Sequence, residues 1–487
     1  MKKSITFLTA LLIVAQLAAC CETAIEPSVT TEGEETTTAP EDTRDSSLPE
    51  KLDFGGTEIR ILYWKGQGEC TDEQNGEIVN DALYNRDRTV EDRLGVKLTN
   101  IEREYTWSGR MEYIDTIRQS VMANDGAFDL VSGQYYAMPA LIPDGALLAL
   151  NETKYIDLSN PWWANGLVEQ TAINGKVYLA SGEISISNIK ELSCFFYNKR
   201  LIDEYSLEDP YELVESGEWT LDKLFKMTSD IYSDLDNDGK KSLADLYGCS
   251  FYNDNAIYPL LTGAGLNLTT LDKSGYPELT LGTERAVDVM DKIASFVHNK
   301  KGSFLPSVAG VGDATEVKKA FSSGLGVFAT GLVQDAATQY NAMEDDFGVL
   351  PTPKFDAAQE KYLTLVNEGN TLFGITASTK DPDAASAVFE ALCEENHYTV
   401  SPAYFEVALK VKYSRDDKSA QMFDLIREGV TFDFGRLYAG ATGVTLGSAD
   451  MKNAITQDSG WASVYASKKD AAKAAIDSFI ESVKNLG

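Results

Sequence analysis

Short stretches of alternating apolar and polar residues recur along this chain, separated by longer stretches with helical spacing. The segment from Glu58 to Trp64 alternates and is rich in β-forming residues, and a helical pattern from Glu77 to Leu94 follows, closed by Gly95. The same order repeats in a strand at 96–103, a helix at 110–122, a buried strand at 128–131 and a helix near 139–148. This alternation predicts an α/β fold with a mostly parallel sheet covered on both faces.

The second half of the chain is first mainly helical in pattern and then returns to strand patterns. After 176–185 and the apolar segment 191–205, helical patterns dominate at 221–232, 283–297 and 314–321. Strand character returns at 347–355 and 370–379, before helical patterns at 383–394, 402–411 and 471–483. Two α/β bodies that share interleaved segments predict a hinged pair of lobes with a cleft between them.

Aromatic residues gather near the ends of the predicted strands, where ligands bind in open α/β sheets. Aromatic faces suit the CH-rich faces of sugar rings, and nearby amides and carboxylates suit the hydroxyls. Any single one of them is equally well explained by core packing. The candidate ligand-binding residues are Trp64, Trp107, Tyr135, Tyr136, Trp162, Trp163, Phe251, Tyr252, Asn370 and Trp461. Trp219 is different, because it precedes Thr220, a good N-cap for the helix from Leu221, and it is expected to be structural.

The composition limits the classes of partner and of functional site that this chain can have. The 487 residues suffice for two or three globular units, and a formal net charge of −32 argues against nucleic acid as a partner. The only histidines are His298 and His397, so a His-rich metal site or a serine–histidine–acid triad has almost no raw material. Cys21, Cys70, Cys194, Cys249 and Cys393 contain no C-x-x-C motif, which excludes zinc and redox motifs but leaves a disulfide open.

The N-terminus has the pattern of an export signal. Lys2 and Lys3 precede an apolar run from Ile5 to Ala15 that is too short to span a membrane. The signal, 1–19, ends in Leu17-Ala18-Ala19-Cys20, which resembles a bacterial lipobox and implies a lipidated Cys20. The following Thr-, Glu- and Pro-rich segment, within 20–51, predicts a disordered, self-repelling tether. We therefore expect an exported protein, anchored by lipid to the outer face of the cytoplasmic membrane.

The segment DLDNDGKKSLAD, 234–245, matches the calcium loop of an EF-hand. Side-chain oxygens would come from Asp234, Asp236, Asp238 and the closing Asp245, with a backbone carbonyl from Lys240 and a direct or water-mediated contact from Ser242. Asp245 replaces the usual glutamate, and Lys241 occupies a normally apolar position. The motif predicts a structural Ca²⁺ ion, and the alternative is a solvated acidic turn.

Several longer segments carry a family resemblance: GKVYLASGE, CFFYNKRLIDEYSLEDPYELVESGEWTLDKL, KKAFSSGLGVFATGL, FGVLPTPKF and NTLFGITASTKDPDAASAVFEAL. With the lipobox, they make the chain similar to the bacterial extracellular solute-binding lipoproteins of carbohydrate ABC importers, solute-binding family 1. The resemblance implies a monomer with the two-lobe, maltose-binding-like (type II) periplasmic-binding-protein fold and several chain crossings at its hinge. It implies lobe 1 at 52–181 with 347–396, and lobe 2 at 182–346 with 397–487.

The same resemblance implies binding without chemistry, in which a sugar or oligosaccharide is captured between the lobes and delivered to an ABC transporter permease. Two alternatives stay open. A secreted carbohydrate-active enzyme of the glycosidase kind would need two suitably spaced carboxylates, and 75 acidic residues make such pairs uninformative. A binding lipoprotein for another solute, such as a peptide, would share the fold.

Overall fold

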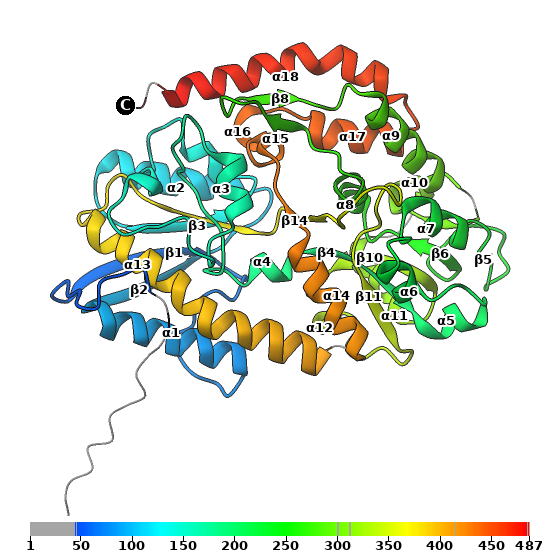
Figure 1. Cartoon of the computed structure of the whole chain (residues 1–487), viewed down its shortest axis with the longest axis horizontal. Coiled ribbons are helices and arrows are strands. Elements are labelled where there is room, and N and C mark those ends of the chain that lie inside the picture. Colours follow the sequence, from blue (N-terminus) through cyan, green and yellow to red (C-terminus); the bar gives the residue numbers. More distant parts are fainter. Residues whose placement is uncertain are drawn as a thin grey trace, which may run out of the picture. The chain divides into compact units, whose positions relative to one another are not determined.

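The first of two large sheets forms from the strand–helix alternation of the N-terminal part (Figure 1). In this computed structural model, which describes residues 44, 46–299, 301–310, 313–413, 415–484 and 486, the strand order is β13-β3-β1-β2. The strands are β1 (Thr57–Trp64), β2 (Val96–Arg103), β3 (Leu130–Gln134) and β13 (Thr371–Ile375). β1 pairs in parallel with β2 and β3, as predicted, whereas β13 is antiparallel to β3 and comes from far along the chain.

Helices cover both faces of the first sheet. They are α1 (Ile78–Leu94), α2 (Arg110–Ala123), α3 (Asn165–Thr171) and α13 (Pro382–Glu395), with short 3-10 helices η1 (Met138–Leu141) and η2 (Leu150–Glu152). α1 packs on α13 on one side, and α2 lies on the other (Figure 1). Glu77 caps the start of α1 by accepting from the N–H groups of Val79 and Asn80. Gly95 ends it with φ +59°, so this predicted helix is confirmed.

The second large sheet is mixed. Its main order is β11-β4-β10-β6-β5, with β9 also paired to β6. Its strands are β4 (Ser193–Asn198), β5 (Tyr232–Ser233), β6 (Leu246–Ser250), β9 (Ser303–Phe304), β10 (Gly326–Leu332) and β11 (Phe347–Leu350). β4 and β10 are buried along their whole length, which explains why their sequences are apolar runs without alternation.

The remaining elements lie around the second sheet or connect the two sheets. The helices before β13 are α4 (Ser187–Lys190), α5 (Lys199–Glu204), α6 (Pro210–Glu215), α7 (Leu221–Thr228), η3 (Asp254–Ala256), α8 (Ile257–Gly263), α9 (Glu284–Val297), α10 (Pro306–Ala309), α11 (Ala314–Ser322) and α12 (Asp335–Thr338). Those after α13 are the π-helical η4 (Asn396–Val400) and η5 (Ala403–Tyr413), α14 (Asp417–Glu428), α15 (Phe434–Leu437), α16 (Ala439–Thr442), η6 (Leu446–Asp450), α17 (Met451–Thr456) and α18 (Trp461–Lys484).

Two small sheets complete the fold. β7 (Thr269–Leu271) and β8 (Pro277–Leu279) form a hairpin, and β12 (Thr364–Leu365) pairs in parallel with β14 (Val430–Thr431). The chain passes between the large sheets around α4, around β12 and again after α13, so β12 and β14 lie among the crossing segments. No helix in the described part of the chain is both long and apolar enough to cross a bilayer.

Three sequence expectations differ from the structure. The expected helix near 139–148 is only the short η1, because Pro143 and Gly145, with φ +64°, turn the chain. The expected helix 221–232 ends at Thr228, and its last residue, Tyr232, begins the edge strand β5. β11 belongs to the second sheet, although the family resemblance implied that residues from 347 onward return to lobe 1. The division into lobes stays a proposal, with its second crossing after β11.

Candidate functional site

The predicted ligand-binding residues fall into a partly exposed group and a buried group. Trp107 is 52% exposed and Tyr136 is half-buried. The others are buried: Trp64, Tyr135, Trp162, Trp163, Phe251, Tyr252, Asn370 and Trp461. Only the first two of the ten therefore present a substantial ring surface at which a ligand can stack.

The buried tryptophans use their indole N–H groups inside the protein. Trp64 donates to Thr371 Oγ1 at 3.0 Å, and Trp461 donates to the carbonyl of Leu281 at 2.8 Å. Trp162 and Trp163 donate to the two carboxylate oxygens of Glu390 on α13, each at 3.0 Å. Buried polar groups require such partners, so these four residues act as packing anchors in this structure.

Trp107 and Tyr136 form a small aromatic surface between the end of β2 and the loop after β3. Their ring centroids are 5.4 Å apart, and the Arg110 guanidinium lies 4.3 Å from the Trp107 ring centroid. Arg110 also donates to the Trp107 carbonyl at 2.6 Å. The hydrogen bond and the cation–π contact hold the exposed indole in one orientation. We call Trp107, Tyr136 and Arg110 the aromatic platform.

A charged group that the sequence analysis missed lies near this platform. The Arg436 guanidinium is 4.6 Å from the Tyr258 ring centroid and 3.6 Å from Glu368 Oε1. Burial raises the pKa of Tyr258, Arg436 opposes this rise, and Glu368 and Tyr136 add to it, so all three groups lie close enough to act on Tyr258. Gly440 fits this approach, because a Cβ there would lie 2.1 Å from the Tyr136 carbonyl oxygen. Hydrogen-bonding groups thus adjoin the exposed rings.

Asn370 belongs to a buried polar network close to the first crossing segment. Its Oδ1 accepts from Ser187 Oγ at 3.0 Å, and its carbonyl accepts from the Tyr135 N–H at 2.9 Å. Its side chain is fully buried, so it fixes the backbone beside Tyr135 and Tyr136 and offers no open surface.

The signal that could have located Glu368 is its place two residues before Asn370, just ahead of a predicted strand.

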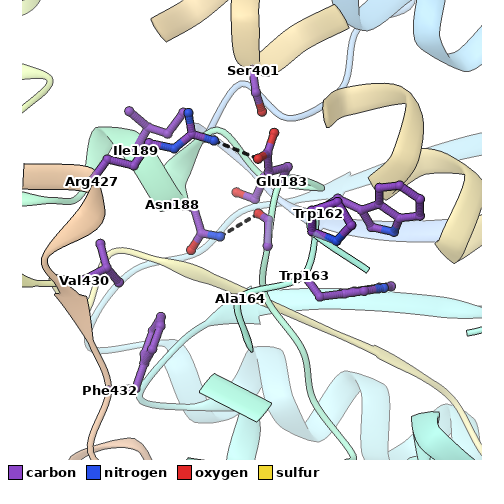
Figure 2. A pocket seen from close by; sticks show the side chains of 13 residues that line it. Trp162, Trp163, Ala164, Glu183, Asn188, Ile189, Ser401, Arg427, Val430 and Phe432 are labelled. Carbon is purple, nitrogen blue, oxygen red and sulfur yellow. Dashed lines mark hydrogen bonds and ion pairs between the residues drawn. The ribbon is translucent and has the colours of Figure 1, made fainter. Parts of the chain in front are cut away.

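A cavity of about 220 Å³ lies where the crossing segments meet, and we call it the hinge pocket (Figure 2). Its walls are Pro161, Trp162, Trp163, Ala164, Gly182, Glu183, Ser185, Asn188, Ile189, Ser401, Arg427, Val430 and Phe432. Figure 2 shows the indole rings of Trp162 and Trp163 pointing away from Val430 and Phe432. These rings pack in the core with Phe389 and His397.

The predicted calcium loop brings part of its ligand set together. Carboxylate oxygens of Asp234, Asp236 and Asp245 lie within 4.8 Å of one another, and Asp245 is buried. Asp234 Oδ2 accepts from the Gly239 N–H at 2.9 Å, and Gly239 has φ +74°. The Asp238 N–H bond lowers the pKa of Asp236, but desolvation and the charges of Asp238 and Asp245 outweigh it and raise that pKa overall. A bound cation would relieve this repulsion between the carboxylates of the loop.

The other predicted calcium ligands lie outside that triad. Asp238 Oδ1 accepts from the Lys240 N–H at 2.7 Å, and the Ser242 hydroxyl accepts from the Ala244 N–H at 3.0 Å.

Cys20 lies outside the described residues. Cys70, Cys194, Cys249 and Cys393 are free thiols, so no disulfide forms among them.

Comparison with known proteins gives structural likeness only. No protein-family model matches the chain, and no curated protein matches its sequence. A cyclo/maltodextrin-binding protein solved with maltotetraose matches with TM-score 0.55 and 15% identity, over 91% of this chain and 98% of its own.

Two further solved structures give the same result. The cyclic alpha-maltosyl-1,6-maltose binding protein from Arthrobacter globiformis matches with TM-score 0.58 and 15% identity, over 88% of this chain and 99% of its own. The ABC substrate-binding protein Lmo0181 from Listeria monocytogenes, solved with cycloalternan, matches with TM-score 0.53 and 13% identity, over 88% and 99%. The chain thus has the α/β fold of type II periplasmic binding proteins, which confirms the expected fold class.

Proposed function

We propose that this protein captures a sugar or oligosaccharide between its lobes and delivers it to the permease of an ABC transporter, without altering it. The observation that carries the proposal is fold likeness over about nine-tenths of the chain to proteins solved with maltotetraose and cycloalternan. The aromatic platform supports it, because an exposed, fixed indole beside charged and hydroxyl groups suits a sugar ring.

The proposal is tested by a thermal-shift screen of the folded body, from Ser46 onward, against a glycan panel, with a peptide panel as the comparison. A ligand at 100 times its dissociation constant raises the free energy of unfolding by about 2.7 kcal/mol. The expected result is stabilisation by a neutral oligosaccharide, accompanied by compaction in small-angle scattering as the lobes close. Stabilisation by peptides alone would redirect the assignment to another solute.

The alternative, a secreted carbohydrate-active enzyme, predicts turnover. Incubation of the protein with mixed oligosaccharides should release no new reducing ends if it only binds. Release of reducing ends would favour the enzyme, and Glu368→Gln would then be the first variant to make, because this carboxylate pairs with Arg436.

We also propose that the 234–245 loop binds one structural Ca²⁺ ion. The donor set fits, because Asp234, Asp236 and Asp245 bring hard oxygen atoms together and their charges repel. Calcium should raise the melting temperature and chelator should lower it. Asp236→Ala should abolish this response, whereas the exposed Asp230→Ala, four residues before the loop, should keep it. An unmoved melting curve with no calcium uptake in calorimetry would leave the loop as an acidic turn.

We further propose that Cys20 carries the lipid anchor, which places the protein at the outer face of the cytoplasmic membrane. The support is the sequence pattern of 1–20, and the acidic segment after it would serve as the spacer.

A further inference from the structure

The hinge pocket carries an inference that is independent of the sugar site between the lobes. It is bounded by segments that belong to different parts of the fold: Gly182 to Ile189 on the first crossing, and Arg427 to Phe432 at the end of α14 and in β14. Residues 161–164 and Ser401 close it from the side of the first sheet. A molecule in this pocket therefore contacts several of the segments on which the lobes must pivot.

Two polar atoms at this pocket are buried without a hydrogen-bond partner. They are Ser401 Oγ, on a residue that is 3% exposed, and Glu183 Oε2. The other carboxylate oxygen of Glu183 is engaged, with Arg427 Nη2 at 2.8 Å and His397 Nδ1 at 3.0 Å. Figure 2 shows Ser401 above Glu183, at the opposite end of the pocket from Phe432. Leaving such atoms unpaired costs about 1–3 kcal/mol each, and a bound molecule that pairs with them would recover this cost.

The chemistry of the walls selects a hydroxyl-bearing occupant. A hydroxyl group both donates and accepts, so it can donate to Glu183 Oε2 and accept from the Ser401 hydroxyl. Arg427 and Glu183 already pair with each other at 2.8 Å, so these walls offer no uncompensated charge to a charged ligand. Phe432, Val430 and Ile189 form an apolar wall suited to the C–H groups of the same molecule.

The size of the pocket limits the occupant. A volume of about 220 Å³ exceeds the roughly 30 Å³ that one water takes in the liquid, yet it is smaller than the sites of drug-sized ligands. We propose that the hinge pocket is a second binding site, which takes one small neutral polyol up to the size of a single hexose. Its ligand is distinct from the longer sugar proposed for the space between the lobes.

The test is calorimetry with glycerol, myo-inositol and D-glucose, carried out in a Trp107→Ala background so that the aromatic platform does not contribute. Ser401→Ala is the critical variant, because replacing an unpartnered buried hydroxyl with a methyl-sized group should leave the fold stable. We expect at least one probe to bind the Trp107→Ala protein, and the affinity to fall at least tenfold when Ser401→Ala is added. Ser323→Ala, an exposed serine elsewhere, should leave the affinity unchanged.

Three outcomes overturn the proposal: no binding of any probe, equal binding with and without the Ser401 hydroxyl, or binding that Trp107→Ala abolishes. The last would assign the small polyol to the aromatic platform. Failure of the glycan panel together with a Ser401-dependent probe would instead remove the proposed oligosaccharide function and keep this site.

Discussion

Trp107 differs from the other five tryptophans, all of which are buried, because more than half of its surface is exposed while Arg110 fixes its orientation. If it stacks on a sugar ring, Trp107→Ala should weaken oligosaccharide binding by about 2 kcal/mol, roughly 30-fold in Kd, as central aromatic contacts do. Titration calorimetry with the best glycan of the panel measures this loss. The melting temperature of the free protein should change little.

The matched control is Tyr205→Ala, at an aromatic residue 37% exposed at the end of α5. It should leave the affinity unaltered. Equal losses from Trp107→Ala and Tyr205→Ala would show that truncation of any surface aromatic residue weakens binding, and Trp107 would then have no special role.

His397 gives the folded protein a pH dependence of known sign. Its contact with the Glu183 carboxylate raises the pKa of His397, against the opposing effects of burial and Arg427. The folded state therefore prefers the imidazolium, and this stabilisation is fully present below about pH 6.5, the unfolded value, and lost as pH rises through the raised pKa. His397→Asn should lower the melting temperature more at about pH 5.5 than at about pH 8.5.

The Glu183→Gln background identifies the source of that dependence. Without the carboxylate, burial and Arg427 still lower the pKa of His397, so the larger effect of His397→Asn at about pH 5.5 should vanish or reverse. A larger effect at about pH 5.5 that survives Glu183→Gln would have to come from another titrating group.

At the scale of secondary-structure elements, α13 holds the Trp162–Trp163 loop against the first sheet through the buried carboxylate of Glu390. Glu390 accepts from Trp162, Trp163, Asn160 and Ser47 side chains and from the Asp157 N–H. Glu390→Gln turns one of these acceptor atoms into a donor that faces other donors, so the free energy of unfolding should fall by about 2–3 kcal/mol. Urea denaturation measures it, and the exposed Glu360→Gln should cost little.

Local signals explain which elements were predictable. Gly95 ends α1 with the left-handed conformation that its position suggested, and Thr220 accepts from the Lys223 N–H at the start of α7 while Trp219 is fully buried. Between Met138 and Leu148, apolar spacing suggested a helix, yet the backbone preferences of Pro143 and Gly145 prevailed. Boundaries depend on single residues of this kind, which periodicity over a window does not resolve.

The candidate site was predictable only for residues that directly follow predicted strands. Trp107 and Tyr136 follow predicted strands, and position alone made them candidates. Tyr258, Glu368 and Arg436 meet only through tertiary packing of distant segments, so nothing in their local sequence links them. Buried and exposed tryptophans look alike in sequence, because each sits in polar, glycine-bearing surroundings, and only the structure separates Trp461 from Trp107.

For the whole molecule, the proposed anchor makes a prediction about where the protein resides. Cys20→Ala should release the protein into the medium or leave it as an unprocessed precursor, because the membrane attachment would lose its acyl chains. Fractionation and mass determination of the mature N-terminus measure this. Unchanged retention of a lipid-free protein would contradict the anchor, and Cys21→Ala, at the neighbouring thiol, should leave attachment intact.

The position of β13 in the first sheet also governs the order in which the chain can fold. β13 covers one edge of β3, and α13 packs on α1, yet both are synthesised after the whole second sheet. Until β13 has been synthesised, the N-terminal strands of the first sheet must therefore have an uncovered edge, a state prone to aggregation. Slow folding follows from this discontinuity, because the edge of β3 is covered only when the chain beyond the second sheet is available.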